Sequence, residues 1–310
     1  MPTPAVENHY PDFPDPFVLQ DAHPSYLAAS TNSDLIRMPT VAATDLGEWS
    51  EAGELLDKDE EPNWVGSQPG FWWAPAVWHN TGADEYVLYY TAREAGSNPR
   101  QCIGAATSPS PQGPYTVEPP FENARVVCDA NTGSIDPSVF VDTGGQAWLL
   151  WKRDGNCCGA ESDIWARRLA SDGTLMGAKE RLIGVSQAWE FGTNAHNTTV
   201  EGPSMAKVGA DYYLFYSGSD WRSSKYAVGY AKCTAPTGGC TKPQDGPILA
   251  SGPNGNGPGG GEVFVDHGGQ RWLAYHAWNP GKPIGDNGER RLHLTKLGLA
   301  GGPPSFGSGP

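Results

Sequence analysis

The chain has 310 residues, a formal net charge of −14 and a pI of about 4.8. This acidity argues against nucleic acid or an anionic membrane surface as a partner, because both carry negative charge. No run of eighteen apolar residues occurs, so we expect no transmembrane helix. With 40 Gly and 28 Pro, the sequence predicts many short strands joined by tight turns.

A short strand-like pattern recurs five times, at intervals of about sixty residues. The copies are rich in aromatic residues and lie at 26–30, 86–90, 147–151, 212–216 and 271–275. Around each copy the sequence reads as strand, turn, strand, loop and strand, with a weaker fourth strand. Radial repetition of such units predicts an all-β fold, a five-bladed β-propeller that forms one domain over residues 1–310. Its inner strands are expected to start near residues 15, 74, 136, 201 and 261.

Two segments are predicted to lie outside this regular pattern. The run 251–260 contains five glycines and predicts a long flexible loop before the last inner strand. The segment 300–310 predicts a disordered tail or the stub of a linker.

The six cysteines bear on location and stability. Cys233 and Cys240 bracket a short turn, so a disulfide between them is predicted, and the pairing of the other four stays open. A structural zinc site is the alternative, although no Cys-x-x-Cys spacing supports it. No secretory signal is visible at the N-terminus. The even cysteine count and the acidic surface nevertheless indicate an exported protein whose signal peptide has been removed.

An acidic residue lies eleven positions before three of the repeated segments: Asp15, Asp136 and Glu201. Inner strands of a propeller all begin at one face of the disc, so these acids are expected to meet at the channel mouth. Asp136 and Glu201 belong to adjacent units, and Asp15 should face Glu201 across the mouth. For any one acid, a turn residue that binds local N–H groups is the alternative.

Such a set of acids suggests hydrolysis of a glycoside. A nearby carboxylate disfavours ionisation of its neighbour, so one acid can stay protonated and serve as a general acid. An aspartate across a gap stays charged and can activate water. Two carboxyl groups separated by a water are the arrangement used for inverting glycoside hydrolysis.

Five motifs together resemble glycoside hydrolase family 43. They are Asp15-Pro-Phe-Val, Trp73-Ala-Pro-Ala-Val, Ile135-Asp-Pro-Ser-Val-Phe, Val200-Glu-Gly-Pro-Ser-Met and Ala274-Tyr-His-Ala-Trp. The resemblance implies a five-bladed propeller and inverting hydrolysis of glycans that contain arabinose or xylose. It also implies that Asp15 is the general base, Asp136 the orienting residue and pKa modulator, and Glu201 the general acid. Asp12 lies near the base but does not match the motif.

The resemblance also suggests three further site residues. In several family members the histidine that matches His276 reaches a central cation through waters, so a structural Ca²⁺ or Na⁺ in the channel is an expectation; the reaction itself requires no cofactor. The alternative is a core histidine bonded to backbone. Trp73 is predicted to stack on substrate, or else to pack in the core. Arg291 or its neighbour Arg290 is predicted to contact substrate hydroxyls, or else to be solvated.

The sequence therefore predicts a secreted, monomeric, exo-acting α-L-arabinofuranosidase. Its expected substrate is a plant cell-wall polysaccharide or oligosaccharide such as arabinan or arabinoxylan. A β-xylosidase and a β-galactofuranosidase are alternatives within the same chemistry. A non-catalytic propeller that binds glycans through its aromatic side chains is the alternative of another class.

Overall fold

The computed structural model describes residues 10, 12–20, 25–33, 36–56, 62–67, 71–122, 125–192, 194, 196, 198–243, 246–253, 255–282, 284–285, 288–300 and 302–310. The strands in these residues form five antiparallel sheets, and each sheet is built from one continuous stretch of chain. The prediction of an all-β, five-bladed propeller is confirmed. In the described part of the chain, no helix is both long and apolar enough to cross a membrane.

The strands of each blade follow one another from the centre outward. Blade one contains β1 (Phe17–Leu19), β2 (Tyr26–Ala29), β3 (Pro39–Ala43) and β4 (Ser50–Glu54). Blade two contains β5 (Trp73–Asn80), β6 (Glu85–Arg93) and β7 (Gln101–Ser108). Blade three contains β8 (Ser134–Val141), β9 (Ala147–Arg153), β10 (Asp163–Leu169) and β11 (Leu175–Gly184). Blade four contains β12 (Val200–Val208), β13 (Asp211–Gly218) and β14 (Ala227–Cys233). Blade five contains β15 (Asn256–Val265), β16 (Arg271–Trp278), β17 (Arg290–Gly298) and β18 (Ser305–Phe306).

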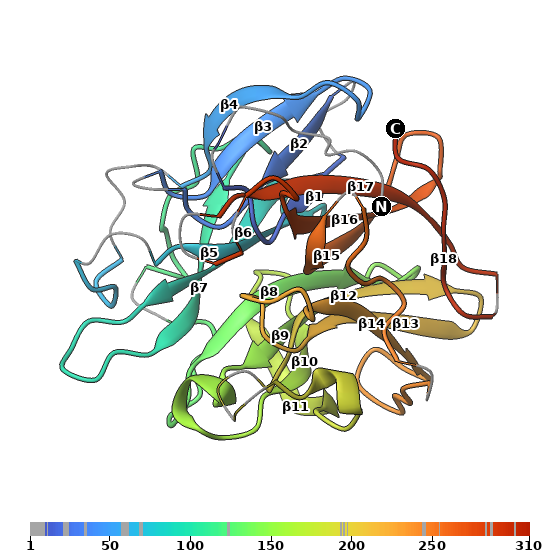
Figure 1. The fold of residues 1–310 in the computed structure, drawn as a ribbon. Helices are drawn as coiled ribbons and strands as arrows, with labels where there is room; N and C mark the ends of the chain where they lie inside the picture. The colour runs from blue at the N-terminus through green and yellow to red at the C-terminus, as the bar shows by residue number, and fades with distance from the viewer. Residues whose placement is uncertain are drawn as a thin grey trace.

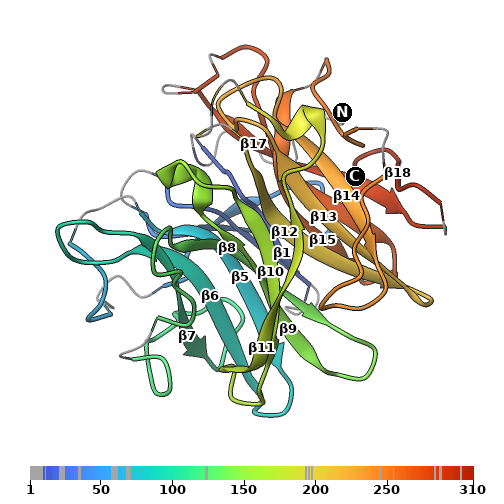
Figure 2. The same ribbon diagram turned by 90° about the horizontal axis from the view of Figure 1, so that it is seen from below.

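The five inner strands close a ring. β1 contacts β5, β5 contacts β8, β8 contacts β12, β12 contacts β15, and β15 contacts β1. Figure 1 shows the consequence for the chain ends: the blue strands of blade one lie beside the red strands of blade five. The view in Figure 2 shows the inner strands gathered near the middle of the molecule.

The hydrophobic core is divided among the five seams between neighbouring blades. The seam between blades five and one packs Tyr26 and Trp49 with Phe264 and Trp272, and the other four seams have clusters of their own. Aromatic rings supply much of this buried surface, because each ring buries a large area and rings pack well edge to face. Most of the aromatic residues are therefore packing residues of the blades.

Both segments that the sequence placed outside the pattern contain strands. β15 begins at Asn256, so the glycine-rich residues 256–260 belong to an inner strand, and the prediction of a flexible loop is wrong there. β18 pairs with β17 through Phe306 and Leu297, which corrects the disordered tail predicted for 300–310. Side-chain hydroxyl and backbone bonds add to this pairing, since Thr295 donates to the Gly307 carbonyl at 3.0 Å.

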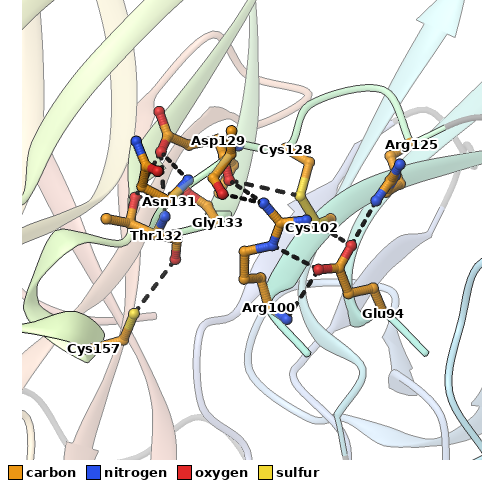
Figure 3. The surroundings of a disulfide bond; sticks show 12 residues. Glu94, Arg100, Cys102, Arg125, Cys128, Asp129, Asn131, Thr132, Gly133 and Cys157 are labelled. Atoms are coloured by element: carbon orange, nitrogen blue, oxygen red, sulfur yellow. Dashed lines mark hydrogen bonds and ion pairs between the residues drawn. A yellow bond between two sulfur atoms is a disulfide. The ribbon is translucent and has the colours of Figure 1, made fainter. Parts of the chain in front are cut away.

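The predicted disulfide Cys233–Cys240 is confirmed, and the remaining cysteines form Cys102–Cys128 and Cys157–Cys158. Cys102 and Cys128 lie beside the carboxylate of Glu94. In the described residues this is the only group of three side chains of metal-binding types whose ligand atoms lie close together. The oxygens of Glu94 are already paired with Arg100 and Arg125, as Figure 3 shows. The two distances are 2.6 Å and 2.5 Å. With its sulfurs in a disulfide and its carboxylate paired, this group does not fit a zinc site.

Candidate active site

The three predicted acids meet at one cavity. Asp15, Asp136 and Glu201 line a hollow of about 290 Å³, and Trp73 and His276 line it with them. A smaller space of about 30 Å³ continues into the channel between the inner strands and is lined by Asp15 and Asp136 as well. Another hollow, of about 660 Å³, lies along β11 and the segment 240–242 and is lined by none of the three acids.

A left-handed residue interrupts the start of every blade's inner strand. The five residues have φ between 45° and 57°: Asp15, Ala74, Asp136, Gly202 and Gly260. In blades two to five the pairing with the second strand shifts register across the same point. A bulge of this kind re-aims the neighbouring side chains. In this protein the bulge turns the side chains at the strand starts toward the cavity.

The bulge shows that the three acids are not at equivalent positions. Asp15 and Asp136 are themselves the left-handed residues, whereas in blade four that residue is Gly202 and Glu201 precedes it. Glu201 therefore corresponds to Trp73 and Ile135, which also line the cavity. The acids of blades three and four nevertheless have the same sequence spacing to the aromatic segment of the blade. The spacing is equal because β12 extends further than β8 before its hairpin turn, and the turn after β12 is shorter than the turn after β8.

A second repeated contact joins each blade to the next. In four of the five seams a side chain in or just after a blade's second strand accepts the N–H of the following blade's left-handed residue. We call these side chains latch residues. They are Thr31 to Ala74 (2.9 Å), Thr91 to Asp136 (3.3 Å), Ser217 to Gly260 (2.9 Å) and His276 to Asp15 (3.0 Å).

Blade three breaks this rule because Lys152 occupies the latch position. Lys152 pairs across the sheet with Ile135, as the latch residue Thr91 pairs with Trp73. An ammonium group has only donors and cannot accept a backbone N–H. The N–H of Gly202 donates to Oδ2 of Asp136 instead, at 2.9 Å, which fixes that carboxyl beside Glu201.

Lys152 binds the predicted general acid directly. Its Nζ is 2.7 Å from Oε2 of Glu201 and 3.1 Å from Oδ1 of Asp154, and its side chain is 2% exposed. The other oxygen of Glu201, Oε1, accepts a 2.8 Å hydrogen bond from the Tyr226 hydroxyl. Both oxygens of Glu201 are therefore held. Burial, and next the charge of Glu201, raise the pKa of Asp136 well above its usual range.

Asp15 is held from two sides. The Thr31 hydroxyl donates to its Oδ2 at 2.7 Å, and Thr31 is also the latch residue of blade one. Burial raises the pKa of Asp15, while the guanidinium of Arg290 and the Thr31 hydrogen bond act against that rise. A base with a raised pKa and fixed orientation suits the removal of a proton from water.

His276 is held by a backbone contact, and the expected cation site stays a prediction. Burial lowers its pKa well below the usual value, so the ring is neutral. Nδ1 accepts the Asp15 N–H, and the ring proton of this tautomer is therefore on Nε2. Nε2 is buried and has no hydrogen-bond partner in the described part of the chain. An N–H at that position cannot coordinate a cation directly, but it can donate to a cation-bound water, as the predicted contact through waters requires. The backbone latch is the contact that the geometry supports.

Arg290, rather than Arg291, lines the cavity. The Arg290 guanidinium pairs with Asp12 at 2.5 Å and lies over the rings of Trp221 and Trp278. Asp12 is thereby the partner of Arg290. Arg291 pairs with Glu289 at 2.6 Å, so its predicted contact with substrate is not supported by its placement.

Sequence reasoning missed Lys152, Tyr226 and Thr31. Each lies on or next to a second or third strand, where a single polar side chain in an aromatic run carries no recognisable motif. The one available signal was the position of Lys152 directly after the apolar run 147–151, since a lysine in a buried strand is rarely without a charged partner.

A family model described as glycosyl hydrolases family 43 matches residues 4–302. The chain belongs to this family. It is 24% identical over 241 residues to a β-D-galactofuranosidase of Aspergillus niger, covering 76% of this chain and 64% of that protein. It is 27% identical over 275 residues to a probable arabinan endo-1,5-α-L-arabinosidase A of Aspergillus clavatus, covering 83% and 79%.

Several relatives of this family 43 chain are longer than it is. The chain spans 64%, 39% and 38% of the lengths of the first three curated relatives that it matches. Among solved structures, a thermostable family-43 glycoside hydrolase superimposes with a TM-score of 0.81 at 26% identity, covering 96% of this chain and 93% of the other. An endo-1,4-β-xylanase of Bacteroides thetaiotaomicron gives a TM-score of 0.79 at 25% identity, covering 98% and 97%.

Proposed function

We propose that the protein is an inverting glycoside hydrolase that releases arabinose from arabinan or arabinoxylan, as an exo-acting α-L-arabinofuranosidase. The observation that carries the proposal is the gathering of Asp15, Asp136 and Glu201 at one cavity of a family 43 propeller. Relatives named for arabinan and for arabinosidase activity support the choice of sugar.

In this proposal the three acids divide the chemistry of one step. Asp15 takes a proton from a water whose oxygen attacks the anomeric carbon. Glu201 gives its proton to the glycosidic oxygen as the bond from that oxygen to the anomeric carbon breaks. Asp136 touches the backbone of Gly202 and orients the acid's segment. Attack from the face opposite the leaving group inverts the anomeric configuration.

The cavity is large enough for the sugar that exo action would release. At about 30 Å³ per water, 290 Å³ is the volume of about ten waters. A pentose also has ten carbon and oxygen atoms, and because these are covalently bonded they occupy less volume than ten waters. Trp73 on one blade and Trp221 on another bound the same hollow, and aromatic faces pack well on the C–H faces of a sugar ring.

Three measurements test this proposal. The enzyme should release arabinose from 4-nitrophenyl α-L-arabinofuranoside, and proton NMR should show the inverted anomer as first product. Glu201→Gln should lose about 10²–10⁴-fold in kcat/KM on arabinan oligosaccharides. Retention of configuration, or an active Glu201→Gln variant, would contradict the proposed roles.

A β-galactofuranosidase is the second candidate, because the Aspergillus niger relative carries that name. A galactofuranose has a longer side chain than arabinofuranose, so it fills the same cavity more tightly. Parallel assays with the arabinofuranoside, the β-galactofuranoside and the β-xyloside decide among the three. The substrate with the highest kcat/KM identifies the sugar, and binding without any turnover would instead favour the non-catalytic glycan-binding propeller.

We also propose that the protein is secreted, works as a monomer and acts on plant cell-wall polysaccharides or oligosaccharides. Three disulfides and the absence of free cysteines in the described residues support an oxidising compartment. Size-exclusion chromatography with light scattering tests whether the protein is a monomer. Detection of the labelled protein in the culture medium tests whether it is secreted.

A further inference from the structure

The buried ammonium of Lys152 is the most unusual group next to the acids. Burial would lower its pKa, but the carboxylates of Glu201 and Asp154 outweigh that effect and raise it. Lys152 therefore stays charged. At the same latch position the other blades have Thr31, Thr91, Ser217 and His276, all of which are neutral. A latch contact requires an acceptor, which an ammonium cannot provide, so Lys152 serves another purpose.

That purpose follows from which groups can donate hydrogen bonds. The ammonium has three donors and no acceptor, and it faces Oε2 of Glu201 at 2.7 Å. A proton on Oε2 would weaken that oxygen as the acceptor of the short contact with the ammonium, so protonation there is disfavoured. When Glu201 is protonated, its proton is therefore on Oε1.

Oε1 has a partner that tolerates both protonation states. The Tyr226 hydroxyl lies 2.8 Å away and can either donate to or accept from it. Burial, and next the charge of Glu201, raise the pKa of Tyr226 well above its usual range, so the phenol stays neutral. Its ring stacks on His276 with centroids 5.8 Å apart, which holds the hydroxyl in place at the cavity wall.

We propose that Lys152 selects the oxygen of Glu201 that carries the catalytic proton. Lys152 donates its hydrogen bond to Oε2, so the proton is carried by Oε1. From Oε1, beside the Tyr226 hydroxyl, the proton passes to the leaving oxygen. This inference rests on the proposed role of Glu201 as general acid. During the step the proton passes from Oε1 to the glycosidic oxygen, the bond to the anomeric carbon breaks, and Tyr226 turns its O–H toward the newly charged Oε1. Lys152 is a positioning residue in this scheme, because it acts through Glu201.

The decisive experiment uses aryl arabinofuranosides whose phenols differ in acidity. Good leaving groups need little protonation, and poor ones need a general acid. Lys152→Met keeps an unbranched side chain, one heavy atom shorter, and removes the charge. We expect kcat/KM to fall about 10²–10⁴-fold for the poorest leaving groups and less than about 10-fold for the dinitrophenyl substrate. In the Glu201→Gln background, Lys152→Met should cause no further loss on poor leaving groups, since both changes remove the same function.

A matched control is available in the same fold. Lys242 is also a buried ammonium, paired with the buried Glu190 at 2.5 Å, and it lies outside the acid cavity. Lys242→Met should lower stability as the loss of a buried ion pair does, yet change kcat/KM equally for every leaving group. Thermal unfolding of both variants separates folding damage from catalytic damage.

The outcomes are distinguishable. Equal loss across the leaving groups in Lys152→Met, or multiplied losses in the double variant, would overturn the proposal and make Lys152 a structural residue. If Lys152→Met does not fold, Tyr226→Phe carries the test. It should show a smaller loss, about 10-fold, confined to poor leaving groups, and a uniform effect would exclude delivery from Oε1. Absence of leaving-group dependence in Glu201→Gln alone would refute the proposed function instead.

Discussion

Gly260 lies so close to Asp15 that a β-carbon at position 260 would overlap Oδ1 of the carboxylate. The same β-carbon would come within 2.8 Å of Nδ1 of His276. Gly260 also has φ of 56°, where a side chain is strained. The glycine-rich start of β15 thus leaves the space in which the predicted base and its latch residue meet.

Gly260→Ala should therefore reduce activity more than stability. Displacing Asp15 by about 1 Å is enough to lower kcat/KM by about 10²-fold, because the attacking water loses its alignment. Gly144→Ala is the matched control, since nothing lies within 4 Å of a β-carbon there. Kinetics and thermal melts of both variants check this prediction. Full activity in Gly260→Ala would mean that the position of Asp15 is not critical.

Asp15 and Asp12 should respond differently to loss of charge. Asp15→Asn removes the proposed base, so kcat should fall by about 10²–10⁴-fold. Asp12 pairs with Arg290 and does not reach the reacting atoms, so Asp12→Asn should mainly raise KM by loosening that guanidinium. Steady-state kinetics on the nitrophenyl substrate separate the two effects. A collapse of kcat in Asp12→Asn with Asp15→Asn active would exchange their roles.

Glu262 should make the protein less stable as the pH rises. Burial raises the pKa of this channel carboxyl from 4.5 to about 8, while hydrogen bonds from Ser138 and Ser204 act against the rise. Between those two values the folded protein keeps a proton that the unfolded chain has released. The free energy of unfolding therefore falls as the pH rises through this window, and the contribution of Glu262 is flat above it.

Denaturant titrations at pH 5, 6.5 and 8 check this prediction. Asp15 and Asp136 also have raised pKa values and add slopes of the same sign, so the test compares two proteins. Glu262→Gln keeps the shape of the side chain and removes the titration, so it should show a shallower decline than the wild type. Parallel curves for the two proteins would exclude Glu262 as a source of the slope.

The fold could be predicted from the sequence because the aromatic second strands repeat at nearly constant spacing and each blade is continuous in the chain. The meeting of Asp15, Asp136 and Glu201 also followed from that repeat. The position of Glu201 relative to the bulge did not follow from the repeat. The bulge shifts the register of strand pairing, and the unequal lengths of the hairpins hide that shift in the sequence spacing. Lys152 was missed for another reason, since its importance depends on its contact with Glu201, which is made only between neighbouring blades.

Because the first and last blades meet at a seam, the site is complete only when the whole chain is present. No strand in the described residues is shared between these blades, and the seam is bridged by bonds such as Phe13 N–H to the Arg290 carbonyl at 2.9 Å and Asp15 N–H to His276. A chain still emerging from the ribosome without blade five already contains all three acids, yet it lacks the His276 latch and the Arg290 charge beside Asp15. Catalytic competence therefore arrives only with the last blade, and a protein clipped within blade five should be inert even where its other blades are intact.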